Sequence, residues 1–308
     1  MTQPVAVPLT HRAILSVSGP DTRGFLQGIT SNDVMSVSGE RSIWSAFLTP
    51  QGKFLHEFVV TADPGTRNPE ATDAADTLWL DVEAGRQDHL HKRLKVYRLR
   101  SKAEITPRAD LKVYALLGER GLGLLDLPAL EGYTRPLGDG MVCVDPRLAI
   151  LGGRAILPSA TAEATLEAAG FAFDTLEAYD RLRLELGIPD GSRDLEPERA
   201  TLMESGFDEL HGVSWDKGCY LGQELTARMK YRGLAKKRLV PVTIEGPTPP
   251  IGSEIRRNGK VAGTLRSAVD GVGLALLKLN QIDTDPGTEP LQAGDAQLTP
   301  QKPAWAQF

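Results

Sequence analysis

The feature that most constrains the fold is a change of pattern near residue 237. Before it, short apolar runs typical of strands alternate with segments in which apolar residues recur at helical spacing. After it the sequence reads as short strands at residues 239–244, 254–257, 260–267 and 273–278, with Asn258 and Gly259 as a hairpin turn. This order predicts an α+β chain, not a doubly wound one, that ends in a small all-β module.

Within the first part, apolar runs predict strands at residues 11–17, 42–48, 54–61, 77–82 and 102–105. Helices are expected at residues 22–27, 83–97, 118–125 and 160–169. Asp21 is suited to capping the first helix. In the second helix Leu90 and Leu94 are expected to pack inward, and the polar stretch at residues 63–76 is expected to be a loop.

The composition is typical of an ordinary globular protein. The chain has 308 residues, enough for two or three compact units. We expect no membrane partner, because no apolar run approaches the ~18 residues of a membrane span. The first 15 residues show neither a secretory nor a transit pattern, which predicts a cytoplasmic protein. The two cysteines, Cys143 and Cys219, fit a reducing compartment and argue against a disulfide scaffold.

The segment most indicative of function is residues 217–224, KGCYLGQE, in which Cys219 lies between Gly218 and Gly222. Residues 225–230 read as the start of a helix, and a thiol at a helix entrance near the Lys217 ammonium would ionise readily. Residues 217–238 hold seven Lys or Arg and one acid, in a chain of net charge -5. The alternative is a glycine-rich turn with Cys219 as a small buried residue.

This run resembles the K-G-C-Y-x-G-Q-E motif of the YgfZ family, folate-binding proteins related to the aminomethyltransferase (T-protein) of the glycine cleavage system. The likeness is greatest to the branch of that family that serves mitochondrial iron–sulfur maturation. Further matches are FLQGITSND at residues 25–33, LTPQGK at 48–53 and RLELGIP at 183–189. Together they span most of the chain.

The resemblance implies a T-protein-like fold. Residues 1–234 would form a folate-binding region of two interleaved α+β subdomains, and residues 235–308 a C-terminal β-barrel that closes a ring around a central channel. The implied function is that of a tetrahydrofolate-binding accessory protein for assembly or repair of iron–sulfur clusters. Its partners would then be folate, iron–sulfur assembly proteins and client iron–sulfur enzymes.

The resemblance also implies site residues. Cys219 and Lys217 would carry the reactivity, with Lys217 lowering the pKa of the thiol or binding the anionic tail of a folate. The implied folate contacts are Glu204, Tyr220, Gly222, Gln223, Glu224 and Arg228. A carboxylate such as Glu204 suits the pterin because it accepts two hydrogen bonds from an aminopyrimidine edge.

Simpler interpretations stand beside these assignments. Lys217 can be a solvated surface lysine, and Arg228 can form an ordinary helix ion pair with Glu224. Cys143 lies in an apolar run and is expected in the core of a strand. We assign no metal ligands, because two cysteines and five scattered histidines do not supply the ligands of an iron–sulfur cluster.

One departure from the relatives bears on catalysis. Aminomethyltransferases carry an essential Asp after a glycine pair, whereas this chain has QGKFLHE at residues 51–57. Glycine-cleavage activity is therefore not expected, and whether the protein is an enzyme stays open. The alternatives are a folate-dependent one-carbon transferase or demethylase, and a noncatalytic module that docks clients through basic residues.

A second basic stretch, at residues 89–102, has six Lys or Arg and no acid. It could be a nucleic-acid surface. The solvated face of a helix explains it better in a protein with a pI near 5.7, so nucleic acid is not an expected partner.

Overall fold

The computed structural model describes residues 3–66, 76–282 and 289–308, so most of the predicted loop at 63–76 lies outside the described residues. The chain forms two compact units. Unit 1 comprises residues 1–48, 55–176 and 211–221, and unit 2 comprises residues 49–54, 177–210 and 222–308. The chain passes from one unit to the other five times, after residues 48, 54, 176, 210 and 221.

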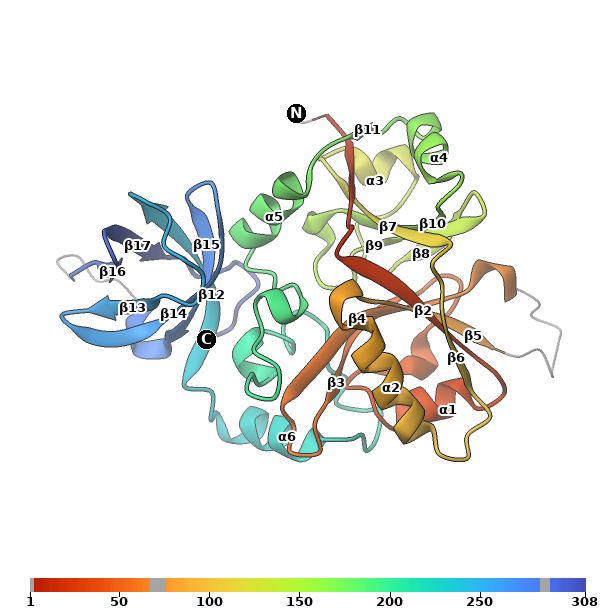
Figure 1. Ribbon diagram of the computed structural model, residues 1–308, viewed down its shortest axis with the longest axis horizontal. Helices are drawn as coiled ribbons and strands as arrows, with labels where there is room; N and C mark the ends of the chain where they lie inside the picture. Colours follow the sequence, from red (N-terminus) through yellow and green to blue (C-terminus); the bar gives the residue numbers. More distant parts are fainter. Residues whose placement is uncertain (1–2, 67–75, 283–288) are drawn as a thin grey trace. The chain divides into compact units, whose positions relative to one another are not determined.

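Unit 1 contains a five-stranded sheet of order β3-β4-β5-β2-β6 (Figure 1). Its strands are β2 (Arg12–Ser18), β3 (Ile43–Leu48), β4 (Phe54–Ala62), β5 (Thr77–Glu83) and β6 (Glu104–Pro107). Helices α1 (Thr22–Gln27) and α2 (Gln87–Arg98) share its core through Phe25, Leu26, Leu90 and Leu94, as predicted for Leu90 and Leu94. Asp21 occupies the N-cap position of α1, but its side chain makes no capping hydrogen bond and instead accepts one from the Lys102 backbone N at 2.7 Å.

The second sheet of unit 1 has six strands in the order β11-β1-β7-β10-β9-β8. They are β1 (Val5–Pro8), β7 (Leu111–Leu117), β8 (Thr134–Leu137), β9 (Gly140–Val144), β10 (Gly153–Pro158) and β11 (Ala172–Phe173). Helices α3 (Gly121–Leu124) and α4 (Ala162–Ala168) accompany it, both shorter than predicted. Cys143 is buried on β9, which confirms its predicted place in a strand core. The chain thus starts in this sheet, builds the five-stranded sheet from β2 to β6, and returns.

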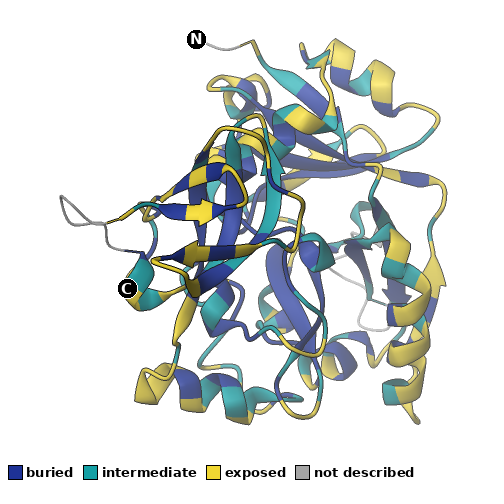
Figure 2. Cartoon of the chain, turned by 60° about the vertical axis from the view of Figure 1, so that its left-hand side comes forward, coloured by how far each residue is buried: buried dark blue, intermediate teal, exposed yellow. Residues whose placement is uncertain are grey.

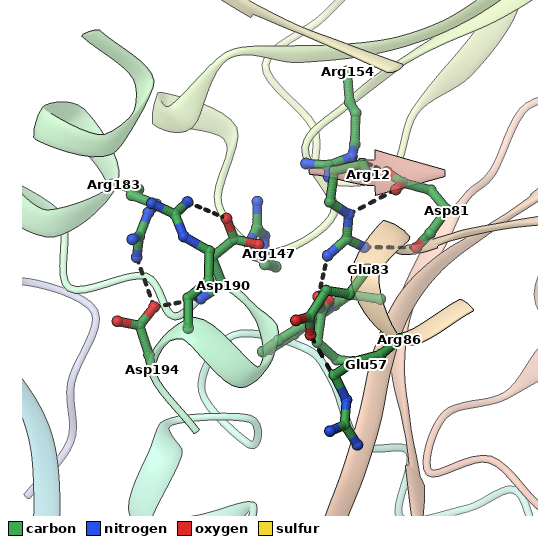
Figure 3. Close-up of polar contacts among 12 residues, drawn as sticks. Arg12, Glu57, Asp81, Glu83, Arg86, Arg147, Arg154, Arg183, Asp190 and Asp194 are labelled. Atoms are coloured by element: carbon green, nitrogen blue, oxygen red, sulfur yellow. Dashed lines mark hydrogen bonds and ion pairs between the residues drawn. The ribbon is translucent and has the colours of Figure 1, made fainter. Parts of the chain in front are cut away.

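A buried polar network joins the two sheets of unit 1 (Figure 3). Arg12 on β2 donates to Glu57 on β4 and, at 2.8 Å, to Asp81 on β5. Arg154 on β10 also donates to Asp81. Burial alone would raise the pKa of the Asp81 carboxyl, but the charges of Arg12 and Arg154 outweigh it and hold that pKa below its usual range.

Unit 2 contains α5 (Leu176–Glu185), which starts at the unit boundary, α6 (Gln223–Arg232) and a closed six-stranded barrel. The barrel strands are β12 (Lys237–Glu245), β13 (Glu254–Arg257), β14 (Lys260–Val269), β15 (Val272–Lys278), β16 (Leu291–Ala293) and β17 (Ala296–Pro300). Buried and exposed residues alternate along β13, β16 and β17, whereas β12 is buried over most of its length. Figure 2 shows buried and exposed residues together on the barrel strands. Asn258 and Gly259 both have positive φ, 50° and 73°, as the predicted two-residue hairpin turn requires.

The α+β class and the all-β module after residue 237 are therefore confirmed. The division into residues 1–234 and 235–308, and the ring around a central channel, stay predictions. Within the described residues, no helix is both long and apolar enough to cross a membrane.

Candidate functional site

The first part of the motif, residues 217–221, lies in unit 1 against the loop that follows α1. The Lys217 Nζ donates to the carbonyl oxygens of Thr30 and Asn32 at 2.6 and 2.8 Å. The backbone N of Leu221 donates to the Gly28 carbonyl at 3.1 Å. Two of the segments that carry the family resemblance, 25–33 and 217–224, therefore meet in the folded chain.

The same loop fastens the segment just before the motif. Ser31 Oγ donates to the Gly212 carbonyl at 2.7 Å, and Asn32 Nδ2 donates to the His211 carbonyl at 2.7 Å. Gln27, at the end of α1, stabilises the loop, because its Nε2 donates to Asp33 Oδ1 at 2.8 Å. Residues 211–221 are consequently held along their length, although they are far in sequence from the rest of unit 1.

Lys217 is bound to the protein and is not a freely solvated lysine. Its ammonium lies 5.2 Å from the centroid of the buried Tyr220 ring, a distance at which cation–π attraction operates. Burial lowers the pKa of Lys217 to about 8, against the opposite influence of Asp33. Lys217 thus anchors the motif, while its predicted catalytic role stays a prediction.

Cys219 is exposed, so the alternative in which it is a small buried residue is wrong. It lies between two glycines whose φ angles, 87° at Gly218 and 80° at Gly222, fall in the region that side-chain-bearing residues rarely adopt. Helix α6 begins at Gln223, two residues earlier than predicted. The two thiols contrast, since burial raises the pKa of Cys143 to about 12.

In unit 2 the start of α6 packs against the turn formed by residues 49–53. Gly52 has a φ of 77°, and a Cβ placed on it would lie 2.6 Å from the Gly222 carbonyl oxygen and 2.7 Å from the Leu225 Cβ. Only glycine fits there. Further along α6, Arg228 forms an exposed ion pair with Glu224 at 3.7 Å, the simpler interpretation above. Folate contacts by Tyr220, Gly222, Gln223, Glu224 and Arg228 stay predictions.

Unit 2 also holds a cavity of about 280 Å³ beside Glu204, which we call the Glu204 cavity. Glu204 lies on a short 3-10 helix (Met203–Ser205), and its carboxylate accepts a hydrogen bond from Thr201 Oγ1 at 3.0 Å. The cavity is lined by Asp194, Leu195, Glu196, Arg199, Ala200, Thr201, Glu204, Ser205, Lys237, Leu239, Arg266 and Leu276. Its volume is near the lower end of small-molecule sites, roughly 300–1,000 Å³.

Opposite charges share the walls of the Glu204 cavity. Arg199, Lys237 and Arg266 supply positive charge, and Glu196 lies 2.7 Å from the Arg199 guanidinium. Of the predicted folate contacts in the described part of unit 2, Glu204 is the one in this lining. Sequence reasoning missed Arg199 and Arg266, because the lining comes from segments with no common spacing.

Cys219 and Lys217 belong to unit 1, whereas Glu204 belongs to unit 2. Across the described ranges, no group of three or more His, Cys, Asp or Glu side chains is arranged to hold a metal ion.

Comparison with known proteins identifies relatives that cover most of the chain. Residues 236–308 match the C-terminal β-barrel domain of CAF17. The chain is 33% identical to the mouse protein "Iron-sulfur cluster assembly factor IBA57, mitochondrial", over 89% of this chain and 77% of that protein. The human protein of the same name is 32% identical, over 87% and 76%.

A solved structure, the glycine cleavage system aminomethyltransferase T from Bartonella henselae, resembles the chain with a TM-score of 0.76. The match covers 99% of this chain and 87% of the aminomethyltransferase chain. At 18% sequence identity, this similarity shows the fold alone. The predicted T-protein-like fold is thereby confirmed.

The prediction of a cytoplasmic protein is contradicted by these relatives, whose names place them in mitochondria. Free cysteines indicate a reducing environment, which does not identify one compartment. A pattern missing from 15 residues was too weak a basis for a location.

Proposed function

The chain belongs to the family of IBA57 iron–sulfur cluster assembly factors, and from this premise we propose that it is an accessory factor in assembly or repair of iron–sulfur clusters in client enzymes. The similarity to the mouse relative over 89% of the chain carries the proposal. The anchored loop that presents an exposed Cys219 supports it. The partners would be iron–sulfur assembly proteins and client enzymes.

Cys219 is the group proposed to act on the partner. Thiolates are the usual ligands of iron–sulfur clusters, which take four. The other cysteine, Cys143, is buried on β9, so this chain can offer a cluster one accessible cysteine. Any cluster met at Cys219 would need its remaining ligands from a partner, as expected of an accessory factor that acts on clusters in transit.

We also propose that the Glu204 cavity binds the pterin of a tetrahydrofolate. The Thr201 hydroxyl orients the Glu204 carboxylate, which can accept hydrogen bonds from the aminopyrimidine edge of a pterin. Leu239 and Leu276 offer apolar surface to the ring, and Arg199 and Lys237 offer positive charge to the anionic tail. The T-protein-like fold is compatible with this assignment.

The alternative, a folate-dependent one-carbon transferase, is less well supported by the segment at residues 51–57. The one carboxylate of this segment, Glu57, is buried, and both of its oxygens already accept hydrogen bonds. One oxygen accepts from Arg12 and the other accepts from Trp44 Nε1 at 2.6 Å. No other Asp or Glu lies in that segment. Formation of methylene-tetrahydrofolate from a methylated amine would favour the transferase.

The thiol is tested by substituting Cys219→Ser and measuring a client iron–sulfur enzyme in cells that depend on this protein. We expect client activity to fall while the circular dichroism and thermal midpoint of the variant stay unchanged, because the side chain is exposed. Cys143→Ala is the matched control and should preserve client activity. Unimpaired clients with Cys219→Ser would remove the thiol from the mechanism.

The folate assignment is tested by calorimetric titration of tetrahydrofolate into the wild type, Glu204→Gln and the exposed control Glu167→Gln. Glu204→Gln keeps the side-chain volume but removes the charge, and affinity should fall by about tenfold or more. Glu167, on α4 of unit 1, should tolerate the change. A wild type that binds no tetrahydrofolate would refute the assignment.

A further inference from the structure

We propose that unit 2 has a second binding site, which takes a small oxyanion, a carboxylate or a phosphate, in a cavity lined by arginines. This arginine cavity has a volume of about 230 Å³ and lies among α5, the short 3-10 helix Gly191–Arg193 and β14. Its lining residues are Asp180, Arg183, Leu184, Arg193, Ile251, Arg266, Ser267 and Ala268.

Arg183 is fully buried, and its guanidinium has more donors than partners among the described residues. Its Nε donates to Asp180 at 2.6 Å and its Nη1 donates to Asp194 at 2.7 Å. Its Nη2 is buried and has no hydrogen-bond partner among the described residues. A buried guanidinium with unmet donors is unfavourable unless a ligand or a water accepts hydrogen bonds from it.

A second arginine in the same wall has an unmet donor as well. The Nε of Arg266, on β14, is buried without a partner in the described chain, and its Nη1 lies 3.8 Å from Glu196. Arg193 completes the set with its side chain 30% exposed. Three arginines and one carboxylate, Asp180, therefore line the cavity. The same arginines also pair with Asp190, Asp194 and Glu196, so the feature that favours a ligand is the unmet N–H donors and not an excess of positive charge.

The carboxylates around the cavity are already engaged. Asp180 receives Arg183 through one oxygen and Arg193 through the other. Asp194 receives Arg183 and the Ser267 hydroxyl. Asp190 likewise pairs with Arg193 at 2.9 Å. Each of these carboxylates thus already accepts from other groups, whereas an incoming anion would bring new acceptors to the unmet donors of Arg183 and Arg266.

Size and access narrow the class of ligand. At ~30 Å³ per water, the cavity has room for about eight waters, enough for a phosphate or a short dicarboxylate but not for a pterin with its tail. Ile251, at the rim, is 59% exposed, so the cavity can be reached from solvent. The planar fork of a guanidinium matches the paired oxygens of carboxylate and phosphate.

The test is calorimetric titration of sodium phosphate and, separately, sodium succinate into the full chain, with ionic strength held constant by sodium chloride. The variants are Arg266→Gln, Arg193→Gln and the control Arg256→Gln, an exposed arginine of the same barrel that pairs with Glu254. The site is supported if the wild type and Arg256→Gln bind the anion equally well while Arg266→Gln and Arg193→Gln each bind it about tenfold or more weakly. Equal binding by all four proteins, or none by the wild type, overturns it.

The source of the oxyanion is identified by competition. Arg266 also lines the Glu204 cavity, so the glutamate tail of a folate is one source and a free anion is the other. If phosphate weakens binding of triglutamyl but not monoglutamyl tetrahydrofolate, the tail occupies the site; if it affects neither, a free anion does. The phosphate titration contains no folate, so failure of the folate proposal leaves it interpretable.

Discussion

Both units bury arginines among aspartates, but the donors of the two sets meet different partners (Figure 3). In unit 1, Arg12 and Arg154 converge on Asp81, and neither arginine has a buried donor without a partner among the described residues. In unit 2, Arg183 engages Asp180 and Asp194 and still has an unmet Nη2. Because both units contain such pairs, a buried ion pair does not by itself indicate a binding site.

What distinguishes the second set is the combination of an unmet donor with an adjoining cavity. Arg238 in unit 2 also has a buried Nε without a partner among the described residues, yet it lines neither the Glu204 cavity nor the arginine cavity. Arg183 and Arg266 have both features. We therefore expect the unit 1 network to serve stability and the arginine cavity to serve binding.

The largest effect expected is on the network of unit 1. Asp81→Asn removes the buried carboxylate on which Arg12 and Arg154 converge, and the free energy of unfolding should fall by about 3–5 kcal/mol in denaturant titration. The control Asp110→Asn, whose pair with Arg108 is exposed, should cost under about 1 kcal/mol. Similar losses in both variants would remove the special status of the network.

The pH dependence of this network follows from the lowered pKa of Asp81. Because the folded pKa is depressed, the carboxylate contributes stability above its unfolded pKa, about 4, and loses it as the pH falls toward the folded value. The Asp81→Asn variant should therefore approach the wild type in stability on acidification.

An intermediate effect is expected for Lys217, a half-buried charge held by carbonyls instead of carboxylates. With its pKa lowered to about 8, the folded protein releases the proton before the unfolded chain does. Stability should then rise between about pH 8 and pH 10.5, by roughly 1–3 kcal/mol. The difference between wild type and Lys217→Met, measured by denaturant unfolding at pH 7.5 and pH 10, isolates it; a difference independent of pH would contradict the shift.

The smallest effect on stability is expected for Arg266→Gln. The side chain is 21% exposed, and its one ion contact within the described ranges, with Glu196, is long at 3.8 Å. The free energy of unfolding should change by less than about 1 kcal/mol. A loss as large as that of Asp81→Asn would instead make Arg266 a structural residue and would erase the contrast between the two sets.

Local pattern predicted much of the fold but not all of it. Apolar runs revealed β2 to β6 and β12 to β15, and the Asn258–Gly259 turn fixed one hairpin. Strands such as β11, with two residues, and β16, with three, are too short to show a period. Their positions depend on pairing with distant strands, which no local window contains.

The site was predictable to a similar extent. The glycines around Cys219 indicated a special backbone, and the structure gives both a positive φ. The anchoring of Lys217 to Thr30, 187 residues away, and the gathering of Arg183 and Arg266 in one wall are products of the folded chain. Spacing in the sequence cannot predict such contacts.

The five passages between units have a consequence for the nascent chain. Unit 1 includes residues 211–221, so ribosomes must translate residues 177–210 of unit 2 before unit 1 can close. The barrel can close only later in synthesis, because its first strand, β12, pairs with its last strand, β17. Until β17 emerges, β12 has an unpaired edge, and open edges invite association with other chains. Synthesis therefore completes the Cys219 loop before the barrel closes, and the open barrel is the stage most in need of protection.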